Sequence, residues 1–357
     1  MNQHDLPQSS IAAAVPLPRL GMGTAPLGNL FAPVSDESAE GAIEAALAAG
    51  IRYFDTAPFY GYGLSERRLG RALSHLPQQS VRISTKVGRL IVADPGHTPT
   101  EGYLVNGYRA VFDYSRDAVL RSFDESLKRL RRDRVDVLLL HDIGAETHGA
   151  RHAAVLQQVL DEALPALQQI REAGGCQAIG IGVNESAVCL ELMQRCHLDC
   201  ILLAGRYTLL EQGSLHTVMA QARSEGTAII IGGAFNSGLL ADPVAPGATY
   251  NYAPVDAAML ARAQRIYDIC ARQGIDVGAA ALQFVLAHPA VVSVVVGMRN
   301  ATEVQSAIAR LRAPIPPALW ESLGDAGLLL DGAPTPDDSN EWTRGGGERR
   351  PTSYPIE

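Results

Sequence analysis

Several features that would mark a membrane-spanning or disulfide-stapled protein are missing from this sequence. No apolar run approaches the roughly 20 residues that a helix needs to cross a bilayer, and the N-terminus carries no basic region followed by an apolar stretch. The five cysteines are scattered and odd in number, in a chain of 357 residues that is long enough to fold without disulfides. We therefore expect reduced thiols and a cytoplasmic protein without a membrane partner.

Long runs of like charge and paired metal-binding motifs are also absent. The net charge of -8 is spread along the chain, which predicts no nucleic-acid partner and leaves small uncharged or acidic molecules open. The segment CHLDC places Cys196 and Cys200 beside His197, but no second ligand pair follows at a spacing typical of zinc sites. We therefore predict no metal site.

The sequence does contain a repeated alternation of short β-rich runs with amphipathic segments. Hydrophobic residues make up 47% and charged residues 19%, which suits a globular protein with a sizeable core. Eight runs are typical of strands: 19–24, 51–56, 81–87, 134–142, 177–184, 198–205, 227–235 and 291–297. Because no linker-like stretch interrupts residues 19–330, one closed (β/α)8 barrel, or TIM barrel, explains the pattern better than two open doubly wound α/β sheets.

The two termini and one long insertion depart from this rhythm. Residues 1–18 and the tail 331–357 are rich in proline and polar residues, so we expect both to be irregular. Residues 88–114 separate the third strand from its helix, and loops of this length are typically lids or binding loops. The insertion places six polar or aromatic side chains near the expected barrel mouth: Arg89, Tyr103, Tyr108, Arg109, Phe112 and Tyr114.

Polar residues end three of the predicted strands. These are Asp55, Lys86 and His141, and Tyr60 follows Asp55 by five positions. Active sites in (β/α)8 barrels gather at the C-terminal ends of the strands, so we expect the four side chains to converge. A Lys86 ammonium would favour the phenolate form of Tyr60, while Asp55 would hold Lys86 in place and His141 would orient a substrate oxygen. The group predicts proton transfer coupled to hydride transfer with a nicotinamide cofactor.

Each of these residues alone has a structural explanation, such as a buried ion pair for Asp55 and Lys86 or a strand cap for His141. Their combination favours catalysis. Lys86 could instead form a Schiff base, as in an aldolase, but that chemistry needs a neutral amine and pairing with Asp55 opposes it.

The segment GIRYFDTAPFYGYGLSERRLGRAL resembles the first signature of the aldo-keto reductase superfamily. STKVG and LLLHD resemble the segments that supply the lysine and the histidine of that family, and the likeness extends over about residues 18–312. The resemblance implies that Asp55, Tyr60, Lys86 and His141 form the catalytic tetrad, with Tyr60 as the general acid–base.

The resemblance also implies which residues hold the cofactor. Asn184 matches the residue that binds the nicotinamide carboxamide, Thr24 lies by the nicotinamide ribose, and GGAFNSGLL resembles the loop around the pyrophosphate. The implied cofactor-binding positions are Thr24, Asp55, Asn184, Phe235, Asn236, Ser237, Gly238, Leu239, Gly297, Arg299 and Glu303. Phe235 takes the place of the aromatic that stacks on nicotinamide. Glu303 stands where a basic residue often pairs with a 2′-phosphate, which favours NAD, whereas Arg299 leaves NADP open.

Within the superfamily, FDYSRDAVLRSFDESLKRL and RYTLLEQG look most like the branch of aldose 1-dehydrogenases, L-fucose dehydrogenases and pyridoxal 4-dehydrogenases. This likeness implies oxidation of an aldose of the L-fucose, L-galactose or D-arabinose type at C1 to the lactone. The alternatives are a pyridoxal 4-dehydrogenase, a general aldehyde or ketone reductase, a Schiff-base aldolase, and a non-catalytic regulatory subunit. A homo-oligomer remains open.

Overall fold

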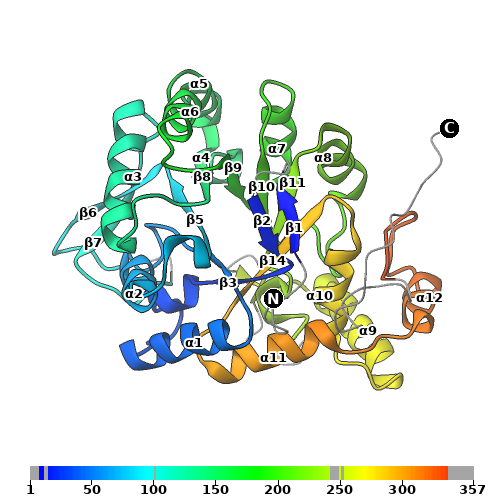
Figure 1. Ribbon diagram of the computed structural model, residues 1–357. Helices are drawn as coiled ribbons and strands as arrows, with labels where there is room; N and C mark the ends of the chain where they lie inside the picture. Colours follow the sequence, from blue (N-terminus) through cyan, green and yellow to red (C-terminus); the bar gives the residue numbers. More distant parts are fainter. Residues whose placement is uncertain (1–7, 12–14, 100–101, 242–248, 251–252, 337–357) are drawn as a thin grey trace.

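Eight parallel strands form a closed barrel in the computed structural model (Figure 1), which describes residues 8–11, 15–99, 102–241, 249–250 and 253–336. In chain order the strands are β3 (Leu20–Gly23), β4 (Tyr53–Asp55), β5 (Arg82–Val87), β8 (Val137–His141), β9 (Ala178–Val183), β10 (Cys200–Ala204), β11 (Ala228–Gly232) and β14 (Val291–Gly297). Each strand pairs with the next, and β14 pairs with β3 to close the ring. The predicted (β/α)8 barrel is confirmed, and the open-sheet alternative is excluded.

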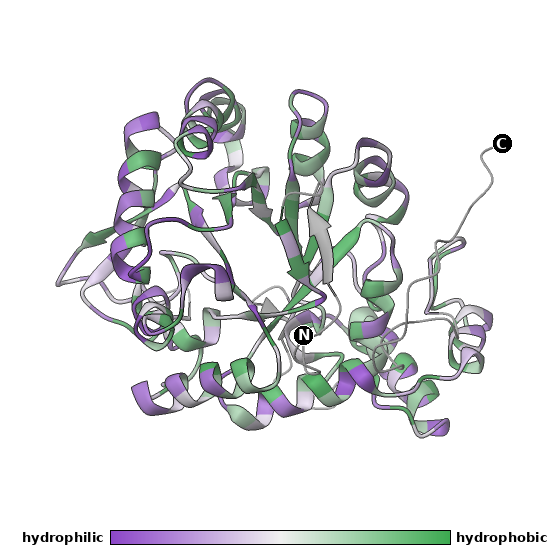
Figure 2. Cartoon of the chain, viewed as in Figure 1, coloured by the Kyte–Doolittle hydropathy of each residue, from purple (hydrophilic) through white to green (hydrophobic). Residues whose placement is uncertain are grey.

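Helices surround the barrel as a ring, with their apolar faces turned toward the strands (Figures 1 and 2). They are α1 (Asp36–Ala48), α2 (Leu64–Leu73), α3 (Arg116–Leu130), α4 (Ala145–His148), α5 (His152–Gln158), α6 (Leu164–Glu172), α7 (Ser186–Met193), α8 (Ala220–Glu225), α9 (Ala257–Arg272), α10 (Val277–Ala287), α11 (Ala301–Arg312) and α12 (Pro317–Asp325). Short helical turns are η1 (Ala25–Gly28), η2 (Gln78–Ser80), η3 (Gly149–Arg151), η4 (Val159–Ala163), η5 (Leu215–Met219) and η6 (Asn236–Gly238).

Local sequence explains where the helices begin. The side chains of Ser35 and Ser115 accept hydrogen bonds from the first turns of α1 and α3, as expected for N-cap residues. In α3, Val119, Phe123 and Leu130 are buried, in agreement with their helical spacing.

No single helix in the described part of the chain is both long and apolar enough to cross a membrane. Helices α9 and α10 pass that test only when they are joined, across a bend of 104°.

An antiparallel hairpin precedes the barrel and plugs its N-terminal end. It consists of β1 (Gln8–Ile11) and β2 (Val15–Pro18). Val15 and Leu17 are fully buried against side chains that point into the barrel, including Tyr53 and Val137. The expectation that residues 1–18 are irregular is therefore wrong for these two strands, because Val15 and Leu17 alternate with prolines and share one buried face. Residues 1–7 and 12–14 lie outside the described residues.

The insertion 88–114 is built around a second antiparallel ribbon rather than a bare loop. Its strands are β6 (Arg89–Ala93) and β7 (Tyr108–Phe112), with Arg89 opposite Phe112 and Ala93 opposite Tyr108. The ribbon projects beside α3 at the left of Figure 1. The Arg89–Phe112 end adjoins the barrel, whereas Tyr108 is exposed. A further two-stranded piece joins β12 (Thr249–Tyr250) to β13 (Ala253–Pro254). The expected irregular tail 331–357 lies mostly outside the described residues.

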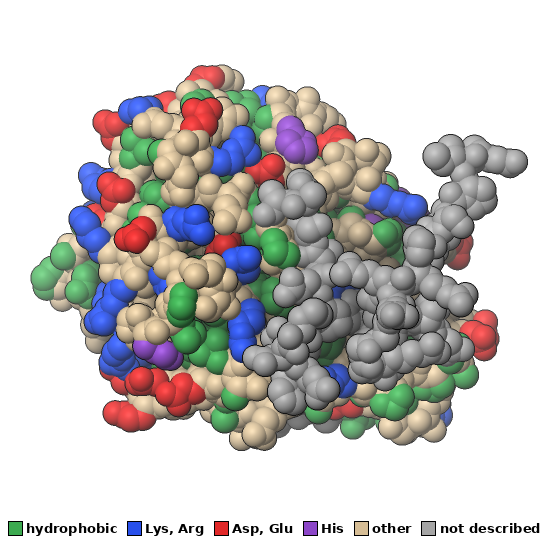
Figure 3. Space-filling view, viewed as in Figure 1, with side chains coloured by type: hydrophobic (Ala, Val, Ile, Leu, Met, Phe, Trp, Pro, Cys, Tyr) green, Lys and Arg blue, Asp and Glu red, His purple; other side chains and the backbone are tan. Residues whose placement is uncertain are grey.

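Small residues on some strands leave room inside the barrel for large side chains from others. A Cβ atom added to Gly21 would lie 2.5 Å from the Tyr53 ring, and one added to Gly182 would lie 3.2 Å from Cε of Lys86. The glycines of β3 and β9 therefore admit Tyr53 from β4 and the long stem of Lys86 from β5. On the outer face shown in Figure 3, acidic and basic side chains are interspersed.

Candidate active site

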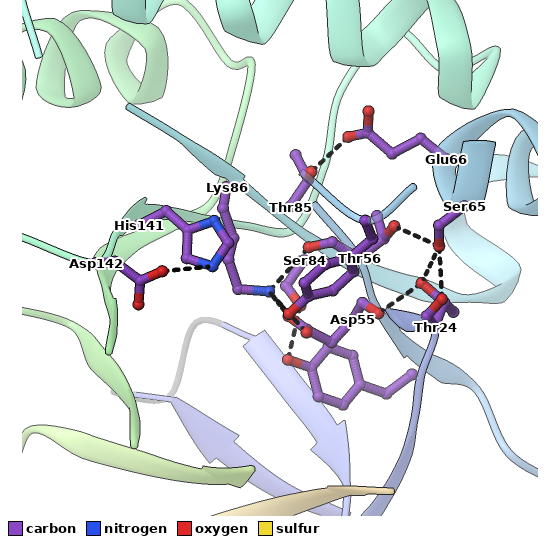
Figure 4. A network of polar contacts seen from close by, with 12 residues as sticks. Thr24, Asp55, Thr56, Ser65, Glu66, Ser84, Thr85, Lys86, His141 and Asp142 are labelled. Atoms are coloured by element: carbon purple, nitrogen blue, oxygen red, sulfur yellow. Dashed lines mark hydrogen bonds and ion pairs between the residues drawn. The ribbon is translucent and has the colours of Figure 1, made fainter. Parts of the chain in front are cut away.

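Lys86 is the centre of a polar cluster at the C-terminal end of the barrel (Figure 4). Its Nζ lies 2.7 Å and 3.0 Å from the two carboxylate oxygens of Asp55, 3.1 Å from the Tyr60 hydroxyl and 2.9 Å from the Thr56 carbonyl. Lys86 and Asp55 are only 1% and 3% exposed, so this ion pair is screened little by solvent. The structure thus brings together Asp55, Tyr60 and Lys86 as the sequence predicts.

A layer of hydroxyl groups beneath Asp55 was not predicted from the sequence. Ser84 Oγ donates to Asp55 Oδ1 over 2.6 Å, and the Tyr53 hydroxyl lies 2.8 Å from Ser84 Oγ. Both residues come from the paired strands β4 and β5, in which Asp55 lies opposite Ser84. Burial raises the pKa of Tyr53 well above its usual value, so its hydroxyl stays protonated and is available as a donor. The strand register therefore fixes the Asp55 carboxylate that holds Lys86.

Tyr60 lies in the turn after β4, and two glycines fix that turn. A Cβ atom on Gly61 would lie 2.4 Å from the carbonyl oxygen of Gly28, so the turn touches η1 through bare backbone. The φ of Gly61 is +62°, which also favours glycine. The Tyr60 ring packs edge-on to His141 at 6.1 Å and stacks beside Tyr103 at 6.3 Å between centroids. Tyr103 thus lies at the site, as expected for the insertion.

His141 ends β8 and is buried beside the other three residues. Desolvation lowers its pKa well below the usual value, and the nearby positive charges of Arg89 and Lys86 act in the same direction. The imidazole is therefore neutral at physiological pH. The backbone carbonyl of His141 accepts a hydrogen bond from the Tyr114 hydroxyl over 2.7 Å, which ties the end of β8 to the insertion.

Two residues missed in the sequence, Asp142 and Phe59, lie beside this histidine. Asp142 Oδ2 is 3.4 Å from His141 Nε2 and 2.9 Å from Arg89 Nη2. The Arg89 guanidinium lies 4.0 Å from the ring centroid of Phe59 and 4.5 Å from that of Phe112. The only sequence signal for Asp142 is that it is a second polar residue, directly after the histidine at the end of a predicted strand.

Two of the six insertion residues lie away from the cluster. Tyr108 is at the outer end of the ribbon, and Arg109 pairs with Asp94 over 3.3 Å with 47% of its side chain exposed. The prediction that both lie near the barrel mouth is wrong, because the insertion forms a ribbon whose far end points away from the barrel.

Comparisons with known proteins agree with this geometry. A model of the aldo/keto reductase family matches residues 19–325. The chain belongs to the aldo/keto reductase family. It is 41% identical over 322 residues to a pyridoxal 4-dehydrogenase from Microbacterium luteolum, a match that covers 87% of this chain and 94% of the relative. It is 38% identical over 336 residues to a D-threo-aldose 1-dehydrogenase from a Pseudomonas species, covering 92% and 98%. This aldo/keto reductase is accordingly an NAD(P)-dependent oxidoreductase.

Other similar proteins give the same family and fold. An L-galactose dehydrogenase from Arabidopsis thaliana is 30% identical over 295 residues, covering 81% of this chain and 83% of the relative. An aldo-keto reductase of Bacillus halodurans, solved in its holo form, superposes with a TM-score of 0.70 at 21% identity, over 90% of this chain and 96% of that chain. At this identity the structural likeness supports the barrel fold alone.

Two of the predicted cofactor contacts of this aldo/keto reductase lie at the C-terminal ends of barrel strands. Asn184 follows β9 directly and is half-buried, and Gly297 is exposed at the end of β14. Thr24 differs from expectation because it is fully buried. Its hydroxyl donates to the Asp55 carbonyl over 2.9 Å and accepts from Ser65 Oγ over 2.7 Å. Thr24 therefore joins β3 to β4, and its contact with a ribose stays a prediction.

The loop expected to face the pyrophosphate uses most of its amide groups internally. The N–H groups of Asn236, Gly238 and Leu239 donate to the carbonyls of Gly233, Phe235 and Asn236. The turns of η6 therefore pair three of the N–H groups of this loop within the loop itself. Asn236 also accepts from the Thr208 hydroxyl over 2.6 Å. The role of residues 236–239 in cofactor binding stays a prediction.

The two remaining cofactor assignments concern Phe235 and the start of α11. The guanidinium of Arg310, in α11, lies 5.3 Å from the Phe235 ring centroid, so this ring packs toward the helix layer. Its stacking on nicotinamide stays a prediction. Glu303 binds Arg299 through the Arg299 backbone N–H at 2.8 Å and through Nη2 at 2.8 Å. The opposing charges of Glu303 and Arg299 therefore form one ion pair.

Metal-ligand residues do not gather in the described part of the chain. No group of three or more His, Cys, Asp or Glu side chains there is placed to hold a metal ion. In the CHLDC segment, Cys200 is buried in the barrel interior, whereas the His197 side chain is 62% exposed. These two side chains therefore do not share a site.

Proposed function

We propose that this protein is an NAD-dependent dehydrogenase that oxidises a free aldose at C1 to the lactone. The observation that carries the proposal is the contact of Lys86 Nζ with both the Asp55 carboxylate and the Tyr60 hydroxyl. Two of the relatives, D-threo-aldose 1-dehydrogenase and L-galactose dehydrogenase, are aldose dehydrogenases by name. The acid–base group and these relatives together support oxidation of a cyclic hemiacetal.

Tyr60 accepts the proton of the C1 hydroxyl in this proposal. The Lys86 ammonium stabilises the resulting phenolate, and the Asp55 carboxylate holds Lys86 against the tyrosine. Neutral His141 donates a hydrogen bond to the same substrate oxygen and orients it. The nicotinamide cofactor, when bound, supplies the acceptor for the hydride that leaves C1. Loss of this hydride and of the hydroxyl proton converts the hemiacetal into a lactone.

The rim of the barrel suits a nicotinamide nucleotide. Gly297 and Gly23 end the neighbouring strands β14 and β3 without side chains, and Gly297 is exposed at the rim where the cofactor would lie. Asn184 offers a carboxamide partner at the end of β9. Because Glu303 already neutralises Arg299, a 2′-phosphate at this position would meet a carboxylate. These features support NAD over NADP.

Lys86 is poorly placed for the Schiff-base alternative. Its ammonium group has three N–H donors and is surrounded by oxygens of Asp55, Thr56 and Tyr60, so no lone pair is free to attack a carbonyl. Incubation with substrate and borohydride is expected to leave the enzyme active, whereas covalent trapping would favour the aldolase.

A pyridoxal 4-dehydrogenase is the second candidate. The relative at 41% identity carries this name, and Tyr103 and Tyr60 present nearly parallel rings, 28° apart, beside which a pyridine ring could stack. The same four residues would serve this reaction.

The two candidates are separated by supplying L-fucose, L-galactose, D-arabinose and pyridoxal one at a time with NAD and following NADH formation. We expect turnover with at least one of the sugars, and formation of its lactone by mass spectrometry. Activity with pyridoxal alone, or with none of the sugars, would reject the aldose proposal. Activity with neither class would leave the oxidoreductase assignment to be tested with other alcohols.

A further inference from the structure

The backbone turns sharply directly after the active-site histidine. In an extended strand, residues 141 and 142 would point to opposite faces of the barrel wall. Asp142 instead has a φ of +50°, which is rare for a residue other than glycine. Its carbonyl oxygen accepts a hydrogen bond from His148 Nε2 over 2.9 Å, and it shares the Tyr114 hydroxyl proton, over 2.9 Å, with the carbonyl of His141. These contacts hold a turn that returns the Asp142 carboxylate to within 3.4 Å of His141 Nε2 (Figure 4).

Arg89 fixes the other side of that carboxylate. Its Nη2 lies 2.9 Å from Asp142 Oδ2, and its guanidinium is sandwiched between the Phe59 and Phe112 rings. Only 14% of the Arg89 side chain and 17% of the Asp142 side chain are exposed. The same ribbon carries a second ion pair, Arg109 with Asp94, whose side chains are 47% and 38% exposed. The buried pair is therefore held by packing as well as by charge.

The two ring nitrogens of His141 have different surroundings. Nδ1 is buried and has no hydrogen-bond partner among the described residues, so a ligand cannot reach it. Nε2 faces the Asp142 carboxylate and is the nitrogen left to contact a substrate. Three charged side chains lie around His141: Lys86 from β5, Arg89 from β6 and Asp142. The Glu185 carboxylate in turn acts on Asp142. A carboxylate opposite one nitrogen of a neutral imidazole favours the proton on that nitrogen.

We propose that Asp142, held by Arg89, fixes His141 as the tautomer protonated on Nε2. Because the 3.4 Å between Nε2 and Asp142 Oδ2 exceeds the roughly 2.7–3.2 Å of a full hydrogen bond, this N–H can still be donated to the substrate oxygen. Asp142 and Arg89 are positioning residues, and the proposal rests on the orienting role of His141 in the proposed function. Without this carboxylate, the neutral ring would also populate the tautomer protonated on Nδ1. Its Nε2 would then be an acceptor, which repels the lone pairs of a substrate oxygen instead of binding it.

The test compares Asp142→Asn and Arg89→Met with the matched control Arg109→Met, which removes the exposed arginine of the same ribbon. Asp142→Asn keeps the shape of the side chain but removes its charge. Long-range 1H–15N correlation spectra of protein labelled in its histidines report the tautomer of each ring, and the spectrum of His141→Gln identifies the signal of His141. Steady-state kinetics with the active sugar and fluorescence titration with NADH complete the measurements.

We expect wild type and Arg109→Met to show His141 protonated on Nε2. In Asp142→Asn the signal should move toward the Nδ1-protonated form, with kcat reduced at least about tenfold and affinity for NADH unchanged. Arg89→Met should shift the spectrum in the same direction. An unchanged tautomer in both variants would overturn the proposal, even if activity falls. The spectra need no substrate, so failure of the aldose panel alone would count against the proposed function and not against this assignment.

Discussion

Tyr60 is the residue on which the proposed chemistry depends most directly. Tyr60→Phe keeps the ring beside His141 but removes the hydroxyl that contacts Lys86 Nζ. We expect kcat to fall at least about a hundredfold, because the proton of the C1 hydroxyl then has no acceptor. Binding of NADH, measured by fluorescence, should be unchanged. Tyr267→Phe, at a partly exposed position of α9, serves as the control, and a fully active Tyr60→Phe enzyme would remove Tyr60 from the mechanism.

Glu303 is the residue on which the proposed preference for NAD depends. Glu303→Ala removes the carboxylate that neutralises Arg299, so the freed guanidinium becomes available to a 2′-phosphate. We expect the ratio of kcat/KM for NADP to that for NAD to rise about tenfold or more. Glu303→Gln, which keeps an acceptor for the Arg299 N–H, should give a smaller increase. If the ratio stays constant and only stability falls, Glu303 acts solely as part of the cap of α11.

Sequence reasoning at the residue scale succeeded where a side chain ends a strand. Asp55, Lys86 and His141 converge because parallel strands of a closed barrel end on one rim. It failed at Asp142, because the left-handed turn that directs this carboxylate toward His141 depends on hydrogen bonds from Tyr114 and His148, which lie outside the strand. It also gave no sign that the turns of η6 pair the N–H groups of Asn236, Gly238 and Leu239, because a sequence motif does not reveal which N–H groups a turn uses.

The β1–β2 hairpin is the element whose contribution is easiest to isolate. Leu17→Ala leaves a cavity at the N-terminal end of the barrel, and we expect it to lower the free energy of unfolding by about 2–5 kcal/mol. At low temperature kcat should be unchanged, since the proposed tetrad lies at the opposite end of the strands. Denaturant unfolding and steady-state kinetics check both parts. Leu260→Ala, at a partly exposed position in α9, is the control and should change neither the free energy of unfolding nor kcat. A strong loss of kcat in folded Leu17→Ala would show that the hairpin also affects the catalytic end of the barrel.

At the element scale the sequence predicted each barrel strand and missed the three antiparallel two-stranded pieces of the described residues, β1–β2, β6–β7 and β12–β13. Barrel strands are buried on both faces and are visible as apolar runs. The ribbon β6–β7 has side chains that are mostly half-buried or exposed, so its pattern resembles that of a polar loop. The hairpin β1–β2 is short and rich in proline, and its burial depends on the barrel that it plugs.

At the scale of the whole molecule, buried neutral histidines make stability depend on pH. Burial lowers the pKa of His141 and of His148, and it lowers that of His288 from 6.5 to about 4. The unfolded chain therefore binds protons more readily, so this stability is complete above about pH 6.5 and is lost as the pH falls toward about 4. Burial also raises the pKa of Asp136, which has the opposite effect on stability as the pH falls. The contribution of one histidine is therefore measured by comparing a variant that lacks it with wild type.

We expect wild type to lose on the order of 2 kcal/mol more than His288→Asn between about pH 7 and about pH 5. Asparagine keeps an acceptor near the position of Nδ1, which accepts from the Ala290 N–H, but it does not titrate. Denaturant unfolding at each pH provides the measurement. His216→Gln, at an exposed position, should follow wild type. Parallel curves for wild type and His288→Asn would show that His288 does not carry this effect.

The pairing of β14 with β3 has a consequence for biosynthesis. Asp55, Tyr60, Lys86 and His141 have all been translated before half of the chain is made, yet the ring closes only when Val294 meets Leu20. Until then the nascent chain is an open sheet with unpaired edges at β3 and β11, the kind of surface that recruits chaperones or other chains. A premature stop just before residue 291 would remove a single barrel strand and still yield an insoluble product, although every residue of the proposed tetrad had been translated.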